Sequence, residues 1–291
     1  ELTDILYSML GKMDDSEILV YWQLTRGTAI RNHVFPDASV KPNLWITMKP
    51  GKKADPDHVL KLVSTEDTRF LHCNIKTLNL LPNVMAAEKA REQAAMNVCS
   101  TADIVTECAH SNVSILKDGV FITHPTDHYI LPGISRMHLI QECRRLGIPV
   151  DETPFTMKEL LEADEIIVSS STKLVLRACE LEGQPVGGKA SDLFKKLQNA
   201  YVERFLRETE NGDSTASTGR AFALLIFCQM FNAVRKRKNA DSLHRHGTFP
   251  FRPAGSRIFL FSFTQNLRLP NHLQLTASQS HLLHDRAMEI P

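Results

Sequence analysis

Residues 104–123 carry the sequence pattern that most constrains how this chain can fold. Apolar, strand-like runs at 104–105 and 113–116 precede Lys117-Asp118-Gly119, and a third run at 120–123 follows it. An Asp-Gly pair between apolar runs is a strong signal for a tight β-hairpin turn. We therefore expect two strands with a turn between them at Gly119.

Glu107 lies among the apolar residues of this segment. A charged carboxylate is costly to bury unless a cation or a hydrogen-bond donor faces it. The sequence therefore predicts that Glu107 has such a partner.

Lys76 is the single lysine in residues 73–81, where four of the nine residues are Ile or Leu. Desolvation disfavours the ammonium form, so an amine in such surroundings loses its proton more easily than in water. A neutral amine can attack a carbonyl and form a Schiff base, either with a substrate or with pyridoxal phosphate. The alternative is a surface lysine whose aliphatic stem lies on apolar neighbours.

The polar loop at residues 25–36 contains Arg26, Arg31 and His33 between two predicted strands. A guanidinium binds a carboxylate in fork geometry and an imidazole adds a donor, so the loop could hold a carboxylate. The alternative is a solvated hairpin loop.

Two further segments could bind phosphate oxygens. Gly133-Ile134-Ser135 opens a predicted helix, and a helix start presents free backbone N–H groups. Four hydroxyl residues, 169–172, end a short apolar strand. A helix cap and an ordinary turn are the alternatives.

The remaining elements follow from apolar periodicity and turn residues. We expect helices at 2–13, 83–97, 134–146 and 191–208, a capped helix after Thr156, strands at 17–25, 43–47, 60–63 and 165–168, and a linker at 49–56.

Composition favours small-molecule chemistry. The 291 residues are 43% hydrophobic and carry a net charge of +1, so nothing indicates nucleic acid or an acidic membrane surface as a partner. The six cysteines form no Cys-x-x-Cys pair, which is typical of reduced thiols in a cytoplasmic protein. The histidine pairs 124/128 and 244/246 have no supporting carboxylate or cysteine pattern, so we expect no metal site. The apolar run 221–234 is too short to span a bilayer.

Taken in order, these motifs resemble those of the class IV pyridoxal-phosphate-dependent aminotransferases, and most closely the D-amino-acid (D-alanine) transaminase branch. The resemblance runs from about Tyr21 to Glu208. It implies an α+β fold in which a truncated small α/β domain is followed by a larger, barrel-like α/β domain. It also implies a homodimer.

The resemblance assigns a role to each motif. Lys76 would be the catalytic Schiff-base lysine, and Glu107 would pair with the pyridine nitrogen of pyridoxal 5'-phosphate. Arg31 and His33 would receive the substrate α-carboxylate. The cofactor phosphate would be bound by Ile134, Ser135, Ser170 and Ser171.

The implied reaction moves an amino group from a D-amino acid such as D-alanine to a 2-oxo acid such as 2-oxoglutarate in a ping-pong mechanism. Three alternatives remain open: a branched-chain aminotransferase, an aminodeoxychorismate lyase, and a truncated non-catalytic homologue. Arg31 and His33 argue against the first two. The third arises because family members carry a further half-domain upstream of Glu1, with a phosphate-binding arginine and a substrate-facing tyrosine.

Relatives usually have glycine and serine after the glutamate, where this chain has Cys108, Ala109 and His110. We therefore expect an altered lining beside the cofactor ring.

We expect four parts in the chain. Residues 1–50 would be the C-terminal part of the small domain, 51–57 a linker and 58–209 the large cofactor-binding domain. Residues 210–291, which begin with a Ser-, Thr- and Gly-containing linker, would be a tail outside the family, poorly ordered or of non-native origin.

Overall fold

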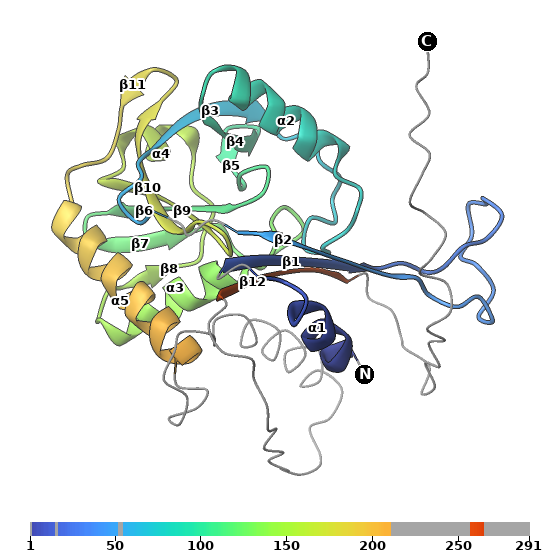
Figure 1. The fold of residues 1–291 in the computed structure, drawn as a ribbon. Helices are drawn as coiled ribbons and strands as arrows, with labels where there is room; N and C mark the ends of the chain where they lie inside the picture. Colours follow the sequence, from blue (N-terminus) through green and yellow to red (C-terminus); the bar gives the residue numbers. More distant parts are fainter. Residues whose placement is uncertain (1, 15–16, 52–54, 211–256, 265–291) are drawn as a thin grey trace, which may run out of the picture.

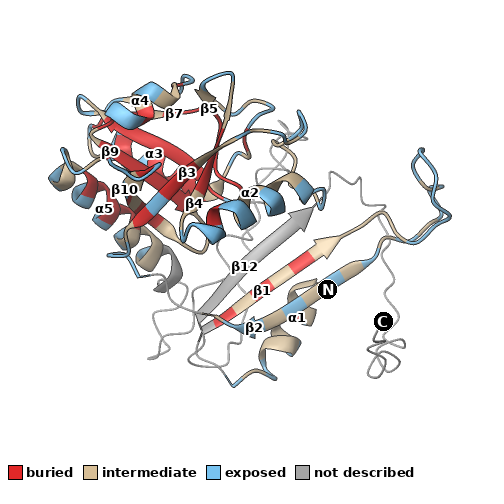
Figure 2. Cartoon of the chain, turned by 90° about the horizontal axis from the view of Figure 1, so that it is seen from above, coloured by how far each residue is buried: buried red, intermediate tan, exposed pale blue. Residues whose placement is uncertain are grey.

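The computed structural model describes residues 2–14, 17–51, 55–210 and 257–264. Within these ranges the strands form two sheets, one of three strands and one of nine (Figure 1). Buried residues concentrate in the larger sheet and on the helices against it (Figure 2). The larger sheet therefore supplies most of the core.

The smaller sheet is built from the N-terminal segment. Helix α1 (Leu2–Leu10) packs against β1 (Glu17–Leu24), which pairs antiparallel with β2 (Leu44–Pro50) and parallel with β12 (Arg257–Thr264). One apolar cluster holds the unit together, with Leu6, Ile18, Val20 and Trp22 at its centre. The loop between β1 and β2 projects away from the larger unit (Figure 1).

The larger unit alternates helices and strands. Its elements are β3 (Leu60–Glu66), α2 (Leu81–Glu92), β4 (Met96–Thr101), β5 (Ile104–Val105), β6 (Asn112–Lys117), β7 (Val120–Thr123), α3 (Ile134–Arg145), β8 (Val150–Asp151), α4 (Met157–Glu162), β9 (Glu165–Ser170), β10 (Leu174–Leu181), β11 (Gln184–Pro185) and α5 (Ser191–Glu210). The strand order is β5-β4-β3-β10-β9-β6-β7-β8, with β11 paired to β10. The sheet is mixed, because β3 runs parallel to β4 and β10 while β9 runs antiparallel to β6 and β10.

The predicted hairpin is confirmed. Strands β6 and β7 pair antiparallel with Lys117 opposite Val120, so Asp118 and Gly119 form a two-residue turn. Both turn residues have positive φ, 51° and 78°, which is the backbone twist that a tight hairpin requires and that Gly adopts without strain. The apolar side chains of β6 then lie in the core beside β9.

The predicted helix after Thr156 also forms. The Thr156 hydroxyl accepts from the backbone N–H of Glu159, and the Glu159 carboxylate accepts from the N–H of Thr156. This reciprocal capping box satisfies backbone donors that a helix start leaves open. The cap fixes the start of α4, whose Leu160 lies in the core.

The sequence prediction of a helix at 83–97 is wrong at its C-terminal end. Helix α2 ends at Glu92, and β4 begins at Met96 and pairs with β3. Ala94 takes a positive φ of 51° between the two. Burial of Val98 and Cys99 in the sheet outweighs the helical propensity of the alanine-rich segment before them.

No described helix is long and apolar enough to cross a membrane. The apolar run 221–234 and most of the expected tail, 211–256 and 265–291, lie outside the described residues. The described residues of the tail are Glu210, which ends α5, and β12.

Candidate active site

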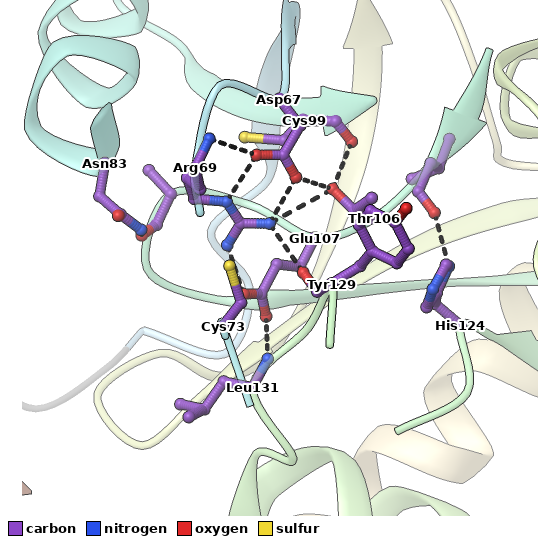
Figure 3. A network of polar contacts seen from close by, with 12 residues as sticks. Asp67, Arg69, Cys73, Asn83, Cys99, Thr106, Glu107, His124, Tyr129 and Leu131 are labelled. Atoms are coloured by element: carbon purple, nitrogen blue, oxygen red, sulfur yellow. Dashed lines mark hydrogen bonds and ion pairs between the residues drawn. The ribbon is translucent and has the colours of Figure 1, made fainter. Parts of the chain in front are cut away.

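A network of polar contacts surrounds Arg69 in the larger unit (Figure 3). Arg69 lies in the loop that follows β3, and its guanidinium donates to both carboxylate oxygens of Asp67, at 2.9 and 2.7 Å. It also donates to a carboxylate oxygen of Glu107 and, at 3.0 Å, to the backbone carbonyl of Tyr129. The Arg69 and Asp67 side chains are each 4% exposed and that of Glu107 is 7% exposed, so this is a buried cation between two buried acids.

Thr106, which directly follows β5, also belongs to this network. Its hydroxyl donates to Asp67 at 2.6 Å and lies 3.1 Å from the carbonyl of Cys99. Asp67 is thus bound by Arg69 and by Thr106. Although desolvation raises the pKa of Asp67, the hydrogen bonds and charge of Arg69 outweigh it and hold that pKa below its ordinary value.

Glu107 has the partner that its sequence position predicted. Its Oε1 faces Arg69, and its Oε2 accepts from Asn112 Nδ2 at 2.8 Å and from the backbone N–H of Leu131 at 3.1 Å. Burial raises the pKa of Glu107 to about 7, with the charge of Arg69 acting in the opposite direction. The carboxyl group can therefore change its protonation state near neutral pH.

Lys76 lies in the loop between β3 and α2. The backbone of Cys73 fixes this loop by donating to the carbonyl of His128 at 3.0 Å. Desolvation lowers the pKa of Lys76, while the negative charge of Glu107 works against that shift. Lys76 and Glu107 therefore act on each other electrostatically, and the amine is closer to its nucleophilic form than a surface lysine.

Asn112 links Glu107 to the start of α3. Its Nδ2 is shared between Glu107 and the carbonyl of Leu131, at 2.8 and 2.9 Å. Gly133 is the N-cap of α3, and a Cβ at this position would lie 2.0 Å from Asn112 Oδ1. The close approach requires glycine here, and the two hydrogen bonds of Asn112 connect the acid to the segment just before the helix.

The predicted phosphate-binding residues lie at the start of a helix and at the end of a strand. Ile134 and Ser135 are the first residues of α3, which has no side-chain cap, and Ser135 is buried. Ser170 ends β9 and Ser171 lies in the turn to β10, where the Ser170 hydroxyl accepts from the N–H of Lys173 at 3.2 Å. Both positions match the sequence prediction of a helix start and a strand end.

Arg31 and His33 are not joined to this site within the chain. Both are exposed on the projecting loop between β1 and β2, and the described contact there is local, from His33 N–H to Asn32 at 2.7 Å. Nearby, the Arg26 guanidinium lies 3.8 Å from the centre of the Phe35 ring.

Comparison with known proteins identifies the family. Residues 1–181 match the family Amino-transferase class IV. Over 213 residues, 71% of this chain and 74% of the relative, the chain is 37% identical to a D-alanine aminotransferase of Listeria monocytogenes serotype 4b. The chain belongs to the class IV aminotransferases.

Solved structures agree on the class IV fold. The fold IV transaminase CpuTA1 of Curtobacterium pusillum matches with a TM-score of 0.52 at 19% identity, over 59% of this chain and 61% of that one. A branched-chain aminotransferase of Thermoproteus uzoniensis matches with a TM-score of 0.50 at 21% identity, over 59% and 60%. The α+β class expected from the sequence is confirmed.

The residues of this class IV chain fit a cofactor that carries a ring N–H and an anionic group. A carboxylate has about four acceptor positions, and Glu107 uses three, so one remains for a ring N–H. The uncapped α3 start can accept an anion. Three buried side-chain polar atoms of the described chain have no hydrogen-bond partner, and two of them, Asn74 Oδ1 and Ser111 Oγ, lie close in sequence to Lys76 and Glu107; the third is Glu165 Oε2.

The sequence did not reveal Arg69, Asp67 or Asn112. The available signal was the pair Asp67-x-Arg69 directly after an apolar strand, where two opposite charges emerge from the core together. Asn112 opens β6 and gave no signal beyond a polar residue ahead of an apolar run.

The described cysteines, 73, 99, 108, 143 and 179, are free thiols. Burial raises the pKa of Cys73 to about 11 and that of Cys108 further, so both stay protonated at neutral pH. Among the described residues there is no group of three His, Cys, Asp or Glu side chains that could hold a metal ion.

Proposed function

We propose that this chain is a pyridoxal-phosphate-dependent D-amino-acid aminotransferase, with D-alanine as donor and 2-oxoglutarate as acceptor. The observation that carries the proposal is the electrostatic coupling of a desolvated Lys76 to the buried Glu107. The similarity to D-alanine aminotransferases supports the choice of substrate.

Each residue has a task that its environment allows. The remaining acceptor position of Glu107 would accept a hydrogen bond from the N–H of the cofactor ring. The N–H groups of Ile134 and Ser135 would bind the phosphate, with Ser170 and Ser171 adding donors. Pyridoxal phosphate, when bound, supplies an electron sink for the electron pair left when the substrate Cα loses its proton.

Lys76 would hold the cofactor and move the proton. Because its pKa is lowered, its Nζ can accept a proton from Cα and return it later. Glu107 would stay ionised beside the cationic ring, although its own pKa is about 7, because an adjacent positive charge favours the carboxylate.

A homodimer would complete the site. Arg31 and His33 lie on a projecting loop whose Ile30, Val34 and Phe35 are 95%, 71% and 74% exposed. Such large apolar side chains favour a protein contact. The start of α2, just after Lys76, also exposes Leu81, Val84 and Met85. We infer that the loop of a second copy covers this surface and brings its Arg31 and His33 to the substrate carboxylate.

The first experiment traps the lysine. Purified protein is mixed with pyridoxal phosphate, reduced with borohydride and digested, and the labelled peptide is identified by mass spectrometry. Lys76 should carry the label; Lys76→Ala should lose both the label and the visible absorbance of the bound cofactor. Lys158→Ala, at an exposed lysine on α4, should retain both. Absence of label on wild-type Lys76 contradicts the proposal.

Turnover then tests the substrate. With 2-oxoglutarate as acceptor, D-alanine should be consumed and L-leucine should not. A preference for L-leucine would instead favour a branched-chain aminotransferase.

A mixing experiment tests the dimer. Lys76→Ala and Arg31→Ala proteins should each be inactive. After unfolding and refolding together they should regain about a quarter of wild-type activity, because half of the dimers are mixed and each mixed dimer has one complete and one defective site. No recovery would mean that Arg31 does not act on a second copy.

A further inference from the structure

His110 and Lys173 form a pair beside Lys76 that the cofactor site does not use. His110 follows β5 in the loop that contains Glu107, and Lys173 lies in the turn between β9 and β10. Lys173 Nζ is 3.2 Å from His110 Nε2. Lys76 is close enough for its charge to act on the imidazole. Three basic side chains from three separate loops therefore converge.

The protons in this pair can be assigned. His110 is exposed at the surface of its loop and Lys173 is half-buried. The residues packed around the ring and the positive charges of Lys173 and Lys76 lower the pKa of His110 to about 4, so the imidazole is neutral at pH 7. Desolvation lowers the pKa of Lys173 from its ordinary value, which lies well above that of an imidazole, so we assign the donor role to the amine. Lys173 thus donates to Nε2, and the imidazole proton sits on Nδ1. Two ammonium protons and one imidazole N–H remain as donors.

The pair has donors and positive charge but no anion. Within the described chain, no carboxylate lies within ion-pair distance of Lys173. Desolvation also lowers the pKa of its amine, so the charged form is disfavoured where it lies. A partly desolvated cation without a counter-charge is unfavourable unless a ligand supplies one. Ser111, next to His110, is 7% exposed and its hydroxyl has no partner, so an unused donor is buried at the same loop.

The backbone holds Lys173 in place. Its N–H donates to the Ser170 hydroxyl at 3.2 Å, and Leu174 takes a positive φ of 57°. A non-glycine residue in this region is strained, and such strain is concentrated at functional positions. The turn therefore fixes the lysine rather than leaving it on a free loop.

We propose that Lys173 and His110 form an anion subsite beside Lys76 that binds the second carboxylate of a dicarboxylic substrate. This inference rests on the proposed function. The cofactor phosphate already has the α3 start and the Ser170 and Ser171 hydroxyls as candidate donors, which leaves the Lys173 charge for a substrate group. A substrate carboxylate and the cofactor phosphate both present anionic oxygens, and the experiment below distinguishes between them.

The test compares two acceptors with one donor. With D-alanine as donor, the Michaelis constants for 2-oxoglutarate and for 2-oxobutyrate are measured with wild type, Lys173→Met and the control Lys158→Met. Lys173→Met should raise the constant for 2-oxoglutarate about tenfold and leave the constant for 2-oxobutyrate unchanged, because a charged hydrogen bond is lost only with the dicarboxylate. The control removes an exposed lysine charge and should change neither value.

Binding is measured separately from turnover. Titration calorimetry of the cofactor-loaded protein with glutarate should show about tenfold weaker binding to Lys173→Met than to wild type. If the protein does not turn over substrate but glutarate still binds more weakly to Lys173→Met than to wild type, the proposed reaction is wrong and the subsite is supported. If Lys173→Met instead weakens pyridoxal phosphate binding and leaves the preference between the two acceptors unchanged, the anion is the cofactor phosphate and the assignment to substrate is overturned. Unchanged values throughout would also overturn it.

Discussion

Replacement of Arg69 by methionine tests the buried network most directly. Methionine fills similar volume but leaves Asp67 and Glu107 buried without a cation. Removing one partner of a buried ion pair costs about 3–5 kcal/mol, because the remaining charge is not compensated. We expect the free energy of unfolding of Arg69→Met to fall by about this amount at pH 8.

The stability difference between wild type and Arg69→Met should grow as the pH rises. In wild type, Arg69 helps to hold the pKa of Asp67 below its ordinary value despite desolvation. Without Arg69, desolvation raises the pKa of both acids, so the variant loses stability as the pH rises and its carboxyl groups ionise. Denaturant unfolding at pH 5 and pH 8 should therefore show a larger gap between wild type and variant at pH 8.

A matched control separates burial from the loss of an arginine. Arg91→Met removes an arginine that pairs with Glu88 on the surface of α2, where both side chains are more than half exposed. Exposed pairs contribute little, so this variant should unfold close to wild type. A loss of less than about 1 kcal/mol for Arg69→Met at pH 8, or a gap that is larger at pH 5, would refute the reasoning.

Single contacts support three more predictions. Glu107→Gln removes a carboxyl group whose pKa rises on folding from 4.5 to about 7. As the pH rises between these values, the free energy of unfolding of cofactor-free wild type should fall by roughly 3 kcal/mol relative to that of the variant, measured by urea unfolding. Gly133→Ala forces a Cβ against Asn112 Oδ1 and should cost about 1–3 kcal/mol in the same assay and weaken pyridoxal phosphate binding measured by absorbance titration. Thr156→Ala removes the capping box of α4 and should cost about 1 kcal/mol by thermal unfolding, with cofactor binding unchanged.

Each of these has an outcome that contradicts it. A pH-independent difference for Glu107→Gln would mean that the carboxyl has the same pKa in both states. Gly11→Ala, where the new Cβ meets its nearest atom at an ordinary 3.5 Å, is the control for Gly133, and equal effects would exclude the Asn112 contact as the cause. Loss of cofactor binding in Thr156→Ala would show that α4 is coupled to the site.

The sequence allowed the prediction of groups whose chemistry conflicts with their neighbours. Glu107 stood out as a carboxylate among apolar residues, and that local contrast was sufficient to predict its partner. Lys76 also stood out as an amine among apolar residues, but its role as the Schiff-base lysine came from the family resemblance and stays a prediction. The hairpin at Gly119 was likewise predictable because its turn is set by two adjacent residues.

Arg69 could not be paired with its acid from the sequence, because the pairing is set by the sheet. Arg69 and Glu107 are 38 residues apart, and they meet only because β4 pairs parallel with β3 and β5 turns back antiparallel on β4. The first two residues of β4, Met96 and Asn97, were expected to end a helix and no strand was predicted after them, so the strand that brings the two loops together was missing. Local propensity favoured the helix, and long-range burial decided the strand.

The same geometry explains why a buried arginine and a proton-accepting glutamate can coexist. A carboxylate with Arg69 as its only partner would be locked in its charged form, whereas one with no partner would stay protonated well above neutral pH. Glu107 lies between these limits, since burial opposes Arg69 while Asn112 and the Leu131 N–H bind the second oxygen. Asn112 also donates to the carbonyl of Leu131, two residues before the N-cap Gly133, so we expect a change at Glu107 to alter the helix start, where an anion would bind. The two ends of the proposed cofactor site are thus bound as one unit, and a substitution at either end should alter both.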